Sequence, residues 1–280
     1  MDPADLRRAA AAVDAAHAVL IGAGAGMGVD SGLPDFRGNQ GFWQAYPPYR
    51  KLGLDFYALA NPHWFESDPT LAWGFYGHRL NLYRSVAPHD GFRILLSWAR
   101  RFECGAHVFT SNVDGHFQKA GFAADCVAEV HGSIHWMQCT RSCGAGVFPA
   151  HDKTINVDME TMRASEPLPS CPSCGTLARP NILMFYDAGW DDCRQAEQMA
   201  RLNDWLDRVR GKRLVVIECG AGTAVPTVRR TCEAVADEFG GTLIRVNARE
   251  PSVPRGQIAL RTGALEGLRA IDSLLTPTKR

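Results

Sequence analysis

The chain has 280 residues, of which 46% are hydrophobic and 21% charged, close to the average for a soluble globular protein, so wholesale disorder is excluded. Its 30 Lys and Arg balance its 30 Asp and Glu, which argues against a protein built to attract nucleic acid or acidic membranes. Residues 9–29 are the most apolar stretch, but Asp14 and His17 interrupt them before a membrane span is reached. Asp2 and Asp5 stand where a secretory signal carries basic residues, so we expect a cytoplasmic protein with reduced cysteines.

Strands and helices alternate through most of the chain. A helix is expected over residues 5–16 and a short buried strand over 18–21, followed by a turn-rich segment. Residues 39–87 read as an irregular insert in which 71–84 have helical spacing, although Gly74 and Gly77 weaken that prediction. Further strands are expected over 106–110, 126–130, 182–185, 214–217 and 242–246, and helices over 91–101, 114–120, 192–210, 227–239 and 264–275. This alternation predicts an α/β fold with a parallel sheet covered by helices on both faces.

A glycine-rich turn follows the first expected strand, from Gly22 to Gly28. Glycines at a strand end let backbone N–H groups approach a pyrophosphate, so the turn is compatible with nucleotide binding. A dinucleotide site of the ordinary dehydrogenase type also needs an acidic residue about 20 residues further on. That region holds Trp43 and Tyr46 instead. The turn is therefore not the usual dehydrogenase fingerprint.

Four cysteines form two knuckles between residues 136 and 178. Cys139 and Cys143 are separated by three residues, Cys171 and Cys174 by two, and both knuckles adjoin Gly or Pro. Four thiolates at such spacing predict a tetrahedral zinc site without an open position, hence a structural metal. The alternative is four buried or redox cysteines.

Three polar clusters fall at the ends of expected strands: 110–114, 131–133 and 246–247. Ligands bind at the carboxyl ends of strands in open α/β sheets. Taken singly, Asp114 could be a helix cap, His131 a core histidine and Asn247 a turn residue.

The order of these motifs resembles that of the sirtuin family. Residues 24–26 with the Gly-Leu-Pro-Asp-Phe-Arg-Gly run at 32–38 are similar to its first signature, and 110–114 to its second. His131-Gly132 is similar to its catalytic dipeptide, the cysteines follow as they do in sirtuins, and 179–185 and Val246-Asn247 are similar to later segments. The chain is identified as a divergent, bacterial-type member over residues 19–275.

The resemblance implies a Rossmann-like NAD-binding domain of residues 1–135 and 179–280, and a small zinc-binding module of residues 136–178. The insert 39–87 would contribute to the cleft between them, and His131 would be the general base. Asn112 and Asp114 would hold the nicotinamide end and act with His131 in catalysis. The residues implied to bind NAD are Gly24, Ala25, Gly26, Asp35, Phe36, Arg37, Ser111, Asn112, Asp114, Gly220 and Asn247.

Sirtuin-like chemistry would make this protein an NAD-dependent protein-lysine deacylase. The acyl-amide oxygen of the substrate attacks the ribose carbon that carries nicotinamide, and a base then activates a ribose hydroxyl. A histidine with a pKa near neutrality suits that proton transfer. The expected products are free lysine, nicotinamide and an O-acyl-ADP-ribose, with NAD as co-substrate, one structural Zn²⁺ and an acylated protein lysine as partner.

Tyr76 and Arg79 lie three residues apart on an expected helix and so share a face. A Tyr-x-x-Arg at this place resembles the sirtuins that remove succinyl and malonyl groups, since a guanidinium binds a carboxylate bidentately. The alternative is a packed tyrosine beside a solvated arginine.

Several positions depart from the family pattern. Gly28 replaces a usual serine, Ser111 a glutamine, and Cys219-Gly220-Ala221 a Gly-Thr-Ser turn. After Phe185 the family has Gly-Glu, whereas this chain has Tyr186-Asp187. Phe185 and Tyr186 are expected to contact the substrate, and Tyr186 could narrow its tunnel.

Two other functions stay open. An NAD glycohydrolase or ADP-ribosyltransferase would consume NAD without deacylation, and a non-catalytic module would bind NAD or ADP-ribose only. Residues 136–178 carry too few cations for nucleic-acid binding. We expect a monomer or weak homo-oligomer.

Overall fold

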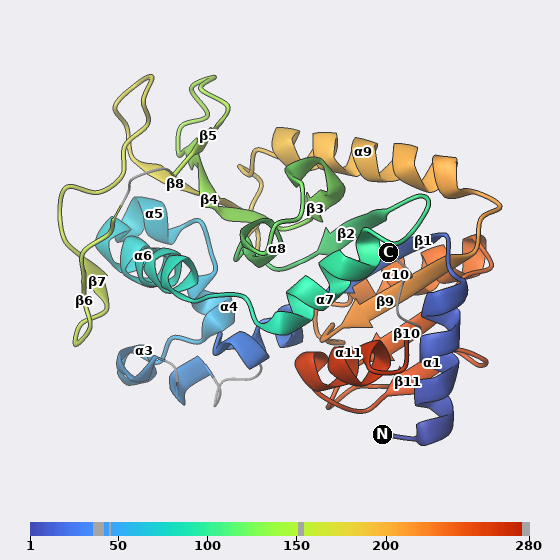
Figure 1. Ribbon diagram of the computed structural model, residues 1–280. Helices are drawn as coiled ribbons and strands as arrows, with labels where there is room; N and C mark the ends of the chain where they lie inside the picture. The colour runs from blue at the N-terminus through green and yellow to red at the C-terminus, as the bar shows by residue number, and fades with distance from the viewer. Residues whose placement is uncertain (36–41, 45, 151–153, 276–280) are drawn as a thin grey trace.

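A computed structural model describes residues 1–35, 42–44, 46–150 and 154–275. Its centre is a six-stranded sheet in the order β11-β10-β9-β1-β2-β3, in which every neighbouring pair is parallel (Figure 1). The strands are β1 (Ala18–Ala23), β2 (Ala106–Thr110), β3 (Val127–Glu129), β9 (Leu214–Cys219), β10 (Thr242–Val246) and β11 (Ile258–Leu260). The expected parallel sheet is confirmed, and β11 is an edge strand that the sequence pattern did not reveal.

Helices cover both faces of this sheet because its strands are apolar on both sides. One core joins alternate strand residues such as Ile21 and Ile217 to α1 (Pro3–Ala15), α7 (Asp90–Ala99) and α11 (Ala264–Asp272). The opposite core joins Leu20 and Val216 to α9 (Cys193–Val209) and α10 (Thr227–Glu238). The short α8 (His116–Lys119) follows β2. No helix among the described residues is long and apolar enough to cross a membrane.

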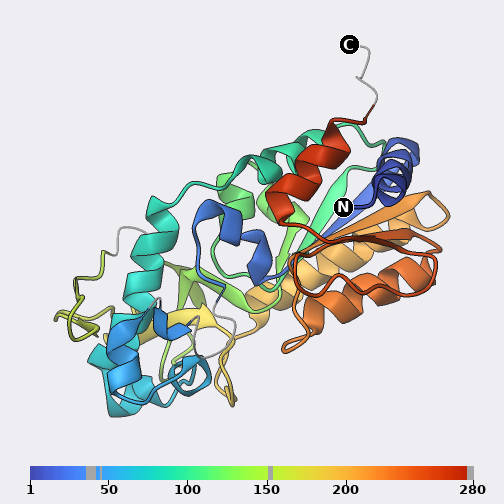
Figure 2. The same cartoon turned by 90° about the horizontal axis from the view of Figure 1, so that it is seen from below.

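A second group of elements lies to one side of the parallel sheet (Figure 2). An antiparallel sheet, in the order β5-β4-β8, consists of β4 (Gly132–Cys139), β5 (Val147–Pro149) and β8 (Ala178–Ile182). β6 (Val157–Asp158) pairs with β7 (Arg163–Ala164). A third core packs these strands against α3 (Pro47–Lys51), α4 (Phe56–Leu59), α5 (Trp64–Ser67) and α6 (Pro69–Ser85).

The strand prediction was wrong at 182–185, because the strand ends at Ile182 and belongs to the small sheet. β4 was missed, since its alternating polar residues carry no continuous apolar run. β4 and β8 extend across residues 136 and 178, the expected limits of the zinc module. The division into domains stays a prediction.

Helix α6 carries two glycines because it packs tightly on the small module. Asp68 accepts a hydrogen bond from Leu71 N and caps the helix. A Cβ on Gly74 would lie 1.9 Å from the carbonyl oxygen of Met162, and one on Gly77 would lie 2.4 Å from a side-chain atom of Ile155. Close approach, rather than a weak helix, explains both glycines.

Candidate active site

A cavity of about 670 Å³ lies at the carboxyl ends of the parallel strands. Its walls come from the segments that follow β1, β2, β3, β9 and β10, together with α4, α6 and the segment after β8. This is where open α/β sheets bind ligands. Sequence-predicted residues lining the cavity are Gly24, Ala25, Asp35, Tyr76, Arg79, Ser111, Asn112, Asp114, His131 and Phe185.

The glycine turns after β1 and β9 are packed against each other. A Cβ on Gly24 would lie 2.6 Å from Ala221 Cα, and one on Gly26 would lie 2.8 Å from Gly220 Cα. Gly220 has a φ of +64°, which favours glycine. Gly26 and Gly220 are not among the lining residues, so they shape the turn, whereas Gly24 and Ala25 line the cavity.

Asn112 and Asp114 are fixed by hydrogen bonds to neighbouring backbone. The Asn112 side-chain amide donates to Gly24 O at 3.0 Å, which ties the turns after β1 and β2 together. Asp114 accepts from His116 N at 2.8 Å at the start of α8. Burial raises the Asp114 pKa to about 6, so the group is mostly a carboxylate at neutral pH but is protonated more readily than an exposed aspartate.

His131 follows β3 and lines the same cavity. Burial lowers the pKa of its imidazole, which is therefore neutral near pH 7 and able to accept a proton. Its carbonyl accepts a hydrogen bond from Leu183 N at 3.0 Å, which links His131 to the segment after β8.

Tyr76 and Arg79 both line the cavity from α6. The Arg79 Nε and Nη2 atoms donate to the hydroxyl of Tyr83, one turn further on, at 3.1 and 3.0 Å. The guanidinium also lies 5.2 to 5.6 Å from the ring centroids of Phe75, Tyr76 and Tyr83. Burial raises the Tyr76 pKa, so its phenol stays protonated. A buried cation bounded by aromatic rings is suited to an anionic group.

The segment after β8 places Phe185 and Tyr186 differently. Phe185 lines the cavity, its N–H donates to Ala60 O at 2.9 Å, and its ring lies 4.6 Å from that of Tyr57. Tyr186 is 93% exposed at a φ of 59° and is not a lining residue, so the expected narrowing of the tunnel is absent. Phe36 and Arg37 lie outside the described residues.

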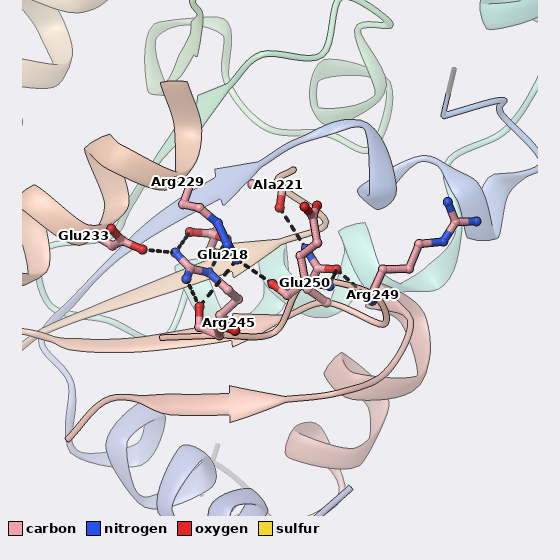
Figure 3. A network of polar contacts seen from close by, with 9 residues as sticks. Glu218, Ala221, Arg229, Glu233, Arg245, Arg249 and Glu250 are labelled. Carbon is pink, nitrogen blue, oxygen red and sulfur yellow. Dashed lines mark hydrogen bonds and ion pairs between the residues drawn. The ribbon is translucent and has the colours of Figure 1, made fainter. Parts of the chain in front are cut away.

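Asn247 organises a loop rather than lining the cavity. Its amide donates to Ala221 O at 2.8 Å, and its oxygen accepts from the backbone N–H groups of Arg249 and Glu250. Arg249 and Glu250, labelled in Figure 3, do line the cavity. Arg249 is paired with Asp35 at 3.5 Å. The sequence analysis did not select Arg249 or Glu250 as site residues. The one feature that could have indicated them is their position just after Asn247.

The four cysteines converge as predicted. The sulfur atoms of Cys139 and Cys174 are 3.6 Å apart, as are those of Cys143 and Cys171, and all four lie within 4.8 Å of one another. Zinc–sulfur bonds of about 2.3 Å at tetrahedral angles place sulfurs about 3.8 Å apart. The residues therefore fit a zinc ion, which would join β4 to the turn before β8.

The sequence profile of the Sir2 family matches residues 24–207. The NAD-dependent protein deacylase of Aeropyrum pernix is 33% identical over 248 residues, covering 87% of this chain and 86% of the relative. That of Pyrococcus furiosus is 33% identical over 230 residues, covering 82% and 80%.

Solved structures agree in fold. A Sir2 homologue mutant in complex with ADP-ribose has a TM-score of 0.68 at 26% identity and covers 98% of this chain and 96% of its own. A second mutant, in complex with 2′-O-acetyl ADP-ribose, has a TM-score of 0.67 at 26% identity and covers all of both chains. The bacterial-type subclass stays a prediction. The chain belongs to the Sir2, or sirtuin, family.

Proposed function

We propose that this protein is an NAD-dependent protein-lysine deacylase that releases nicotinamide and an O-acyl-ADP-ribose. The observation that carries the proposal is the single cavity in which Gly24, Asn112, Asp114 and His131 meet. The relatives from Aeropyrum pernix and Pyrococcus furiosus carry the same activity in their names. The acylated lysine of a protein would be the partner.

The residues that line the cavity would each have a role in binding NAD or in the reaction. The backbone of Gly24 and Ala25 would face the pyrophosphate of NAD, and Asn112 with Asp114 would hold the nicotinamide carboxamide, which needs a donor and an acceptor. The neutral imidazole of His131 would take the proton of a ribose hydroxyl. Among the lining residues, Leu33, Val113 and Ile182 are apolar and would exclude water, whose attack gives plain NAD hydrolysis.

The acyl group would be an acidic one, such as succinyl or malonyl. Arg79 and Tyr76 line the cavity, and the guanidinium is nearly inaccessible to solvent. A carboxylate entering the cavity would gain charge-assisted hydrogen bonds in a site of low dielectric, whereas an acetyl group offers no negative charge. The expected preference is therefore for acyl chains that end in a carboxylate.

The four cysteines would hold a structural Zn²⁺. Their thiolates complete its coordination, so it would stabilise the small module and leave no position for a substrate. The metal would take no part in the reaction.

Product analysis tests the proposal. Purified protein would be incubated with NAD and acetyl-, succinyl-, malonyl- and long-acyl-lysine peptides, and the products identified by mass spectrometry. His131→Ala should abolish O-acyl-ADP-ribose formation, while His63→Ala, at an exposed site outside the cavity, should not. Arg79→Met should lower desuccinylation far more than deacetylation. Bare ADP-ribose as the product would instead indicate a glycohydrolase, and an ADP-ribosylated protein a transferase.

A further inference from the structure

A buried cluster of charges lies directly beneath the loop of residues 247–252. Glu218 on β9 and Arg245 on β10 are neighbours in register, and their side chains are 0% and 1% exposed. Arg245 Nε and Nη2 donate to the two Glu218 carboxylate oxygens at 2.6 and 2.7 Å, a bidentate pair (Figure 3). Glu233 on α10 adds a second carboxylate at 2.7 Å from Arg245 Nη2.

Two guanidinium groups of this region converge on the loop. Arg245 Nη1 donates to Ser252 O, and Arg229 Nη2 donates to Glu250 O and, at 3.4 Å, to Ser252 O. Arg229 precedes Glu233 by one turn of α10, so both side chains come from the same face of that helix. The carbonyls of Glu250 and Ser252 thus accept hydrogen bonds from two guanidinium groups. The carboxylates of Glu218 and Glu233 offset the charge of these two groups.

This ion cluster positions the 247–252 loop rather than adding stability to the fold. Burying an ion pair costs so much desolvation that apolar residues of similar volume often stabilise a fold equally well. The bidentate pair and the two carbonyl contacts do fix the backbone at Glu250 and Ser252, and Arg249 and Glu250 line the cavity. The ion cluster therefore determines where these two side chains stand.

The 247–252 loop follows β10, which β9 and β1 separate from β2 and β3 in the sheet. Asn112 and Asp114 follow β2 and His131 follows β3, so the turn at Gly24, after β1, lies between these residues and the loop along the lining of the cavity. A dinucleotide whose nicotinamide lies at His131 and whose pyrophosphate lies at Gly24 has its adenosine ribose at the loop. Glu250 shares a hydrogen bond with the Thr223 hydroxyl there, and a carboxylate beside a hydroxyl suits a ribose diol.

We propose that Glu218, Arg245, Glu233 and Arg229 are positioning residues that set the 247–252 loop for the adenosine half of NAD. The inference rests on the proposed function in taking NAD as the ligand. A loop freed from these contacts samples positions in which it does not bind, and apparent affinity falls by the fraction that remains competent.

The test uses variants that keep the fully buried Glu218–Arg245 pair whole or remove both of its members. Arg229→Met removes the contact with Glu250 O and keeps helix propensity, and the double variant Glu218→Met with Arg245→Met removes both members of the buried pair. Arg229→Lys tests rescue by a conservative cation. Arg210→Met is the matched control, since it removes an exposed ion pair with Glu238 on the same domain. Calorimetry would measure the Kd of ADP-ribose, and steady-state kinetics the KM of NAD and of the acylated peptide.

We expect the Kd of ADP-ribose and the KM of NAD to rise about tenfold in Arg229→Met and in the double variant, which corresponds to about 1.4 kcal/mol. The KM of the peptide should stay unchanged, as should the melting temperature of Arg229→Met, and Arg229→Lys should recover part of the affinity. ADP-ribose affinity within twofold of wild type in both variants would overturn the inference, as would an equal loss in Arg210→Met or an equal rise in the peptide KM. The primary readout is ADP-ribose binding, which does not depend on deacylation. If the wild type binds ADP-ribose but does not deacylate peptides, the proposed function fails and the inference about the loop can still be tested.

Discussion

Replacing Asp114 by Asn should stabilise the protein at neutral pH while it impairs the reaction. The side chain is 7% exposed and burial raises its pKa from 3.8 to about 6, so the folded state disfavours the ionised carboxylate. Moving this pKa from 3.8 to about 6 corresponds to roughly 3 kcal/mol at most. Asn keeps an oxygen in place for the bond that His116 N donates, and removes the charge.

The effect depends on pH with a definite sign. Because the folded-state pKa is raised, the destabilisation is full above about pH 6 and vanishes below pH 3.8. The gain from Asn should therefore be greatest at pH 7 to 8 and disappear at pH 4. With an unfolding entropy of about 2.1 cal/mol/K per residue, 280 residues convert ~3 kcal/mol into a Tm increase of about 5 °C.

The assay is thermal unfolding of wild type and Asp114→Asn from pH 4 to pH 8, with Asp204→Asn as an exposed control. The catalytic expectation is a loss of at least roughly tenfold in kcat/KM for NAD, because Asp114 would hold the nicotinamide carboxamide. A gain in stability together with a loss of activity is the usual trade-off at a residue placed for function. A Tm below that of wild type at pH 8, or a gain that does not change with pH, would refute the reasoning.

Three further predictions concern packing, protonation and metal. Gly74→Ala should lower the free energy of unfolding by about 1–3 kcal/mol despite better helix propensity, because its Cβ would meet the Met162 carbonyl. Gly189→Ala, where a Cβ has open space, should leave stability unchanged, and equal melting temperatures for the two variants would contradict the prediction. His116 is fully buried and its pKa is lowered to about 4, so the folded state disfavours the protonated imidazole and loses stability as pH falls from 6.5 towards 4. The free energy of unfolding of His116→Leu, measured by urea denaturation, should therefore rise relative to that of wild type between pH 7 and pH 4, and a difference that does not change with pH would count against this prediction. Elemental analysis should find about one zinc per chain in wild type and almost none in Cys171→Ser, and full zinc in the variant would exclude the four-cysteine site.

Most of the parallel sheet was predictable because its central strands bury both faces. Residues 18–21 and 214–217 are unbroken apolar runs, and helical patterns of suitable length follow them. The strands β4 and β8 were not predictable in this way. Their residues include His135, Gln138, Arg179 and Asn181, whose polar groups find partners only after distant segments meet, as when Asn181 donates to Gln138 at 3.0 Å.

The residues at strand ends were predictable as a set because parallel strands bring their carboxyl ends to one edge. Asn112 and His131 reach the cavity by that rule alone. Arg249 and Glu250 look like surface charges in the sequence. Their placement depends on Arg229 and Arg245, which hold the loop through contacts between residues 7 to 23 positions apart. Such contacts leave no periodic trace in the sequence.

The departures from the family pattern can be ranked by what their side chains touch. Asp187 stands where a glutamate is usual and is buried in an ion pair with Arg179 at 2.8 Å, so the shorter acid still anchors the turn after β8. Tyr186 stands where a glycine is usual and keeps the left-handed φ that glycine favours, with its ring in solvent. Gly28, by contrast, lines the cavity, and a Cβ at this position would lie 3.2 Å from Leu33 Cδ1, so that a serine would press on Leu33. Substitutions at Tyr186 should therefore change backbone strain more than catalysis, whereas Gly28→Ser places a new polar group in the site itself.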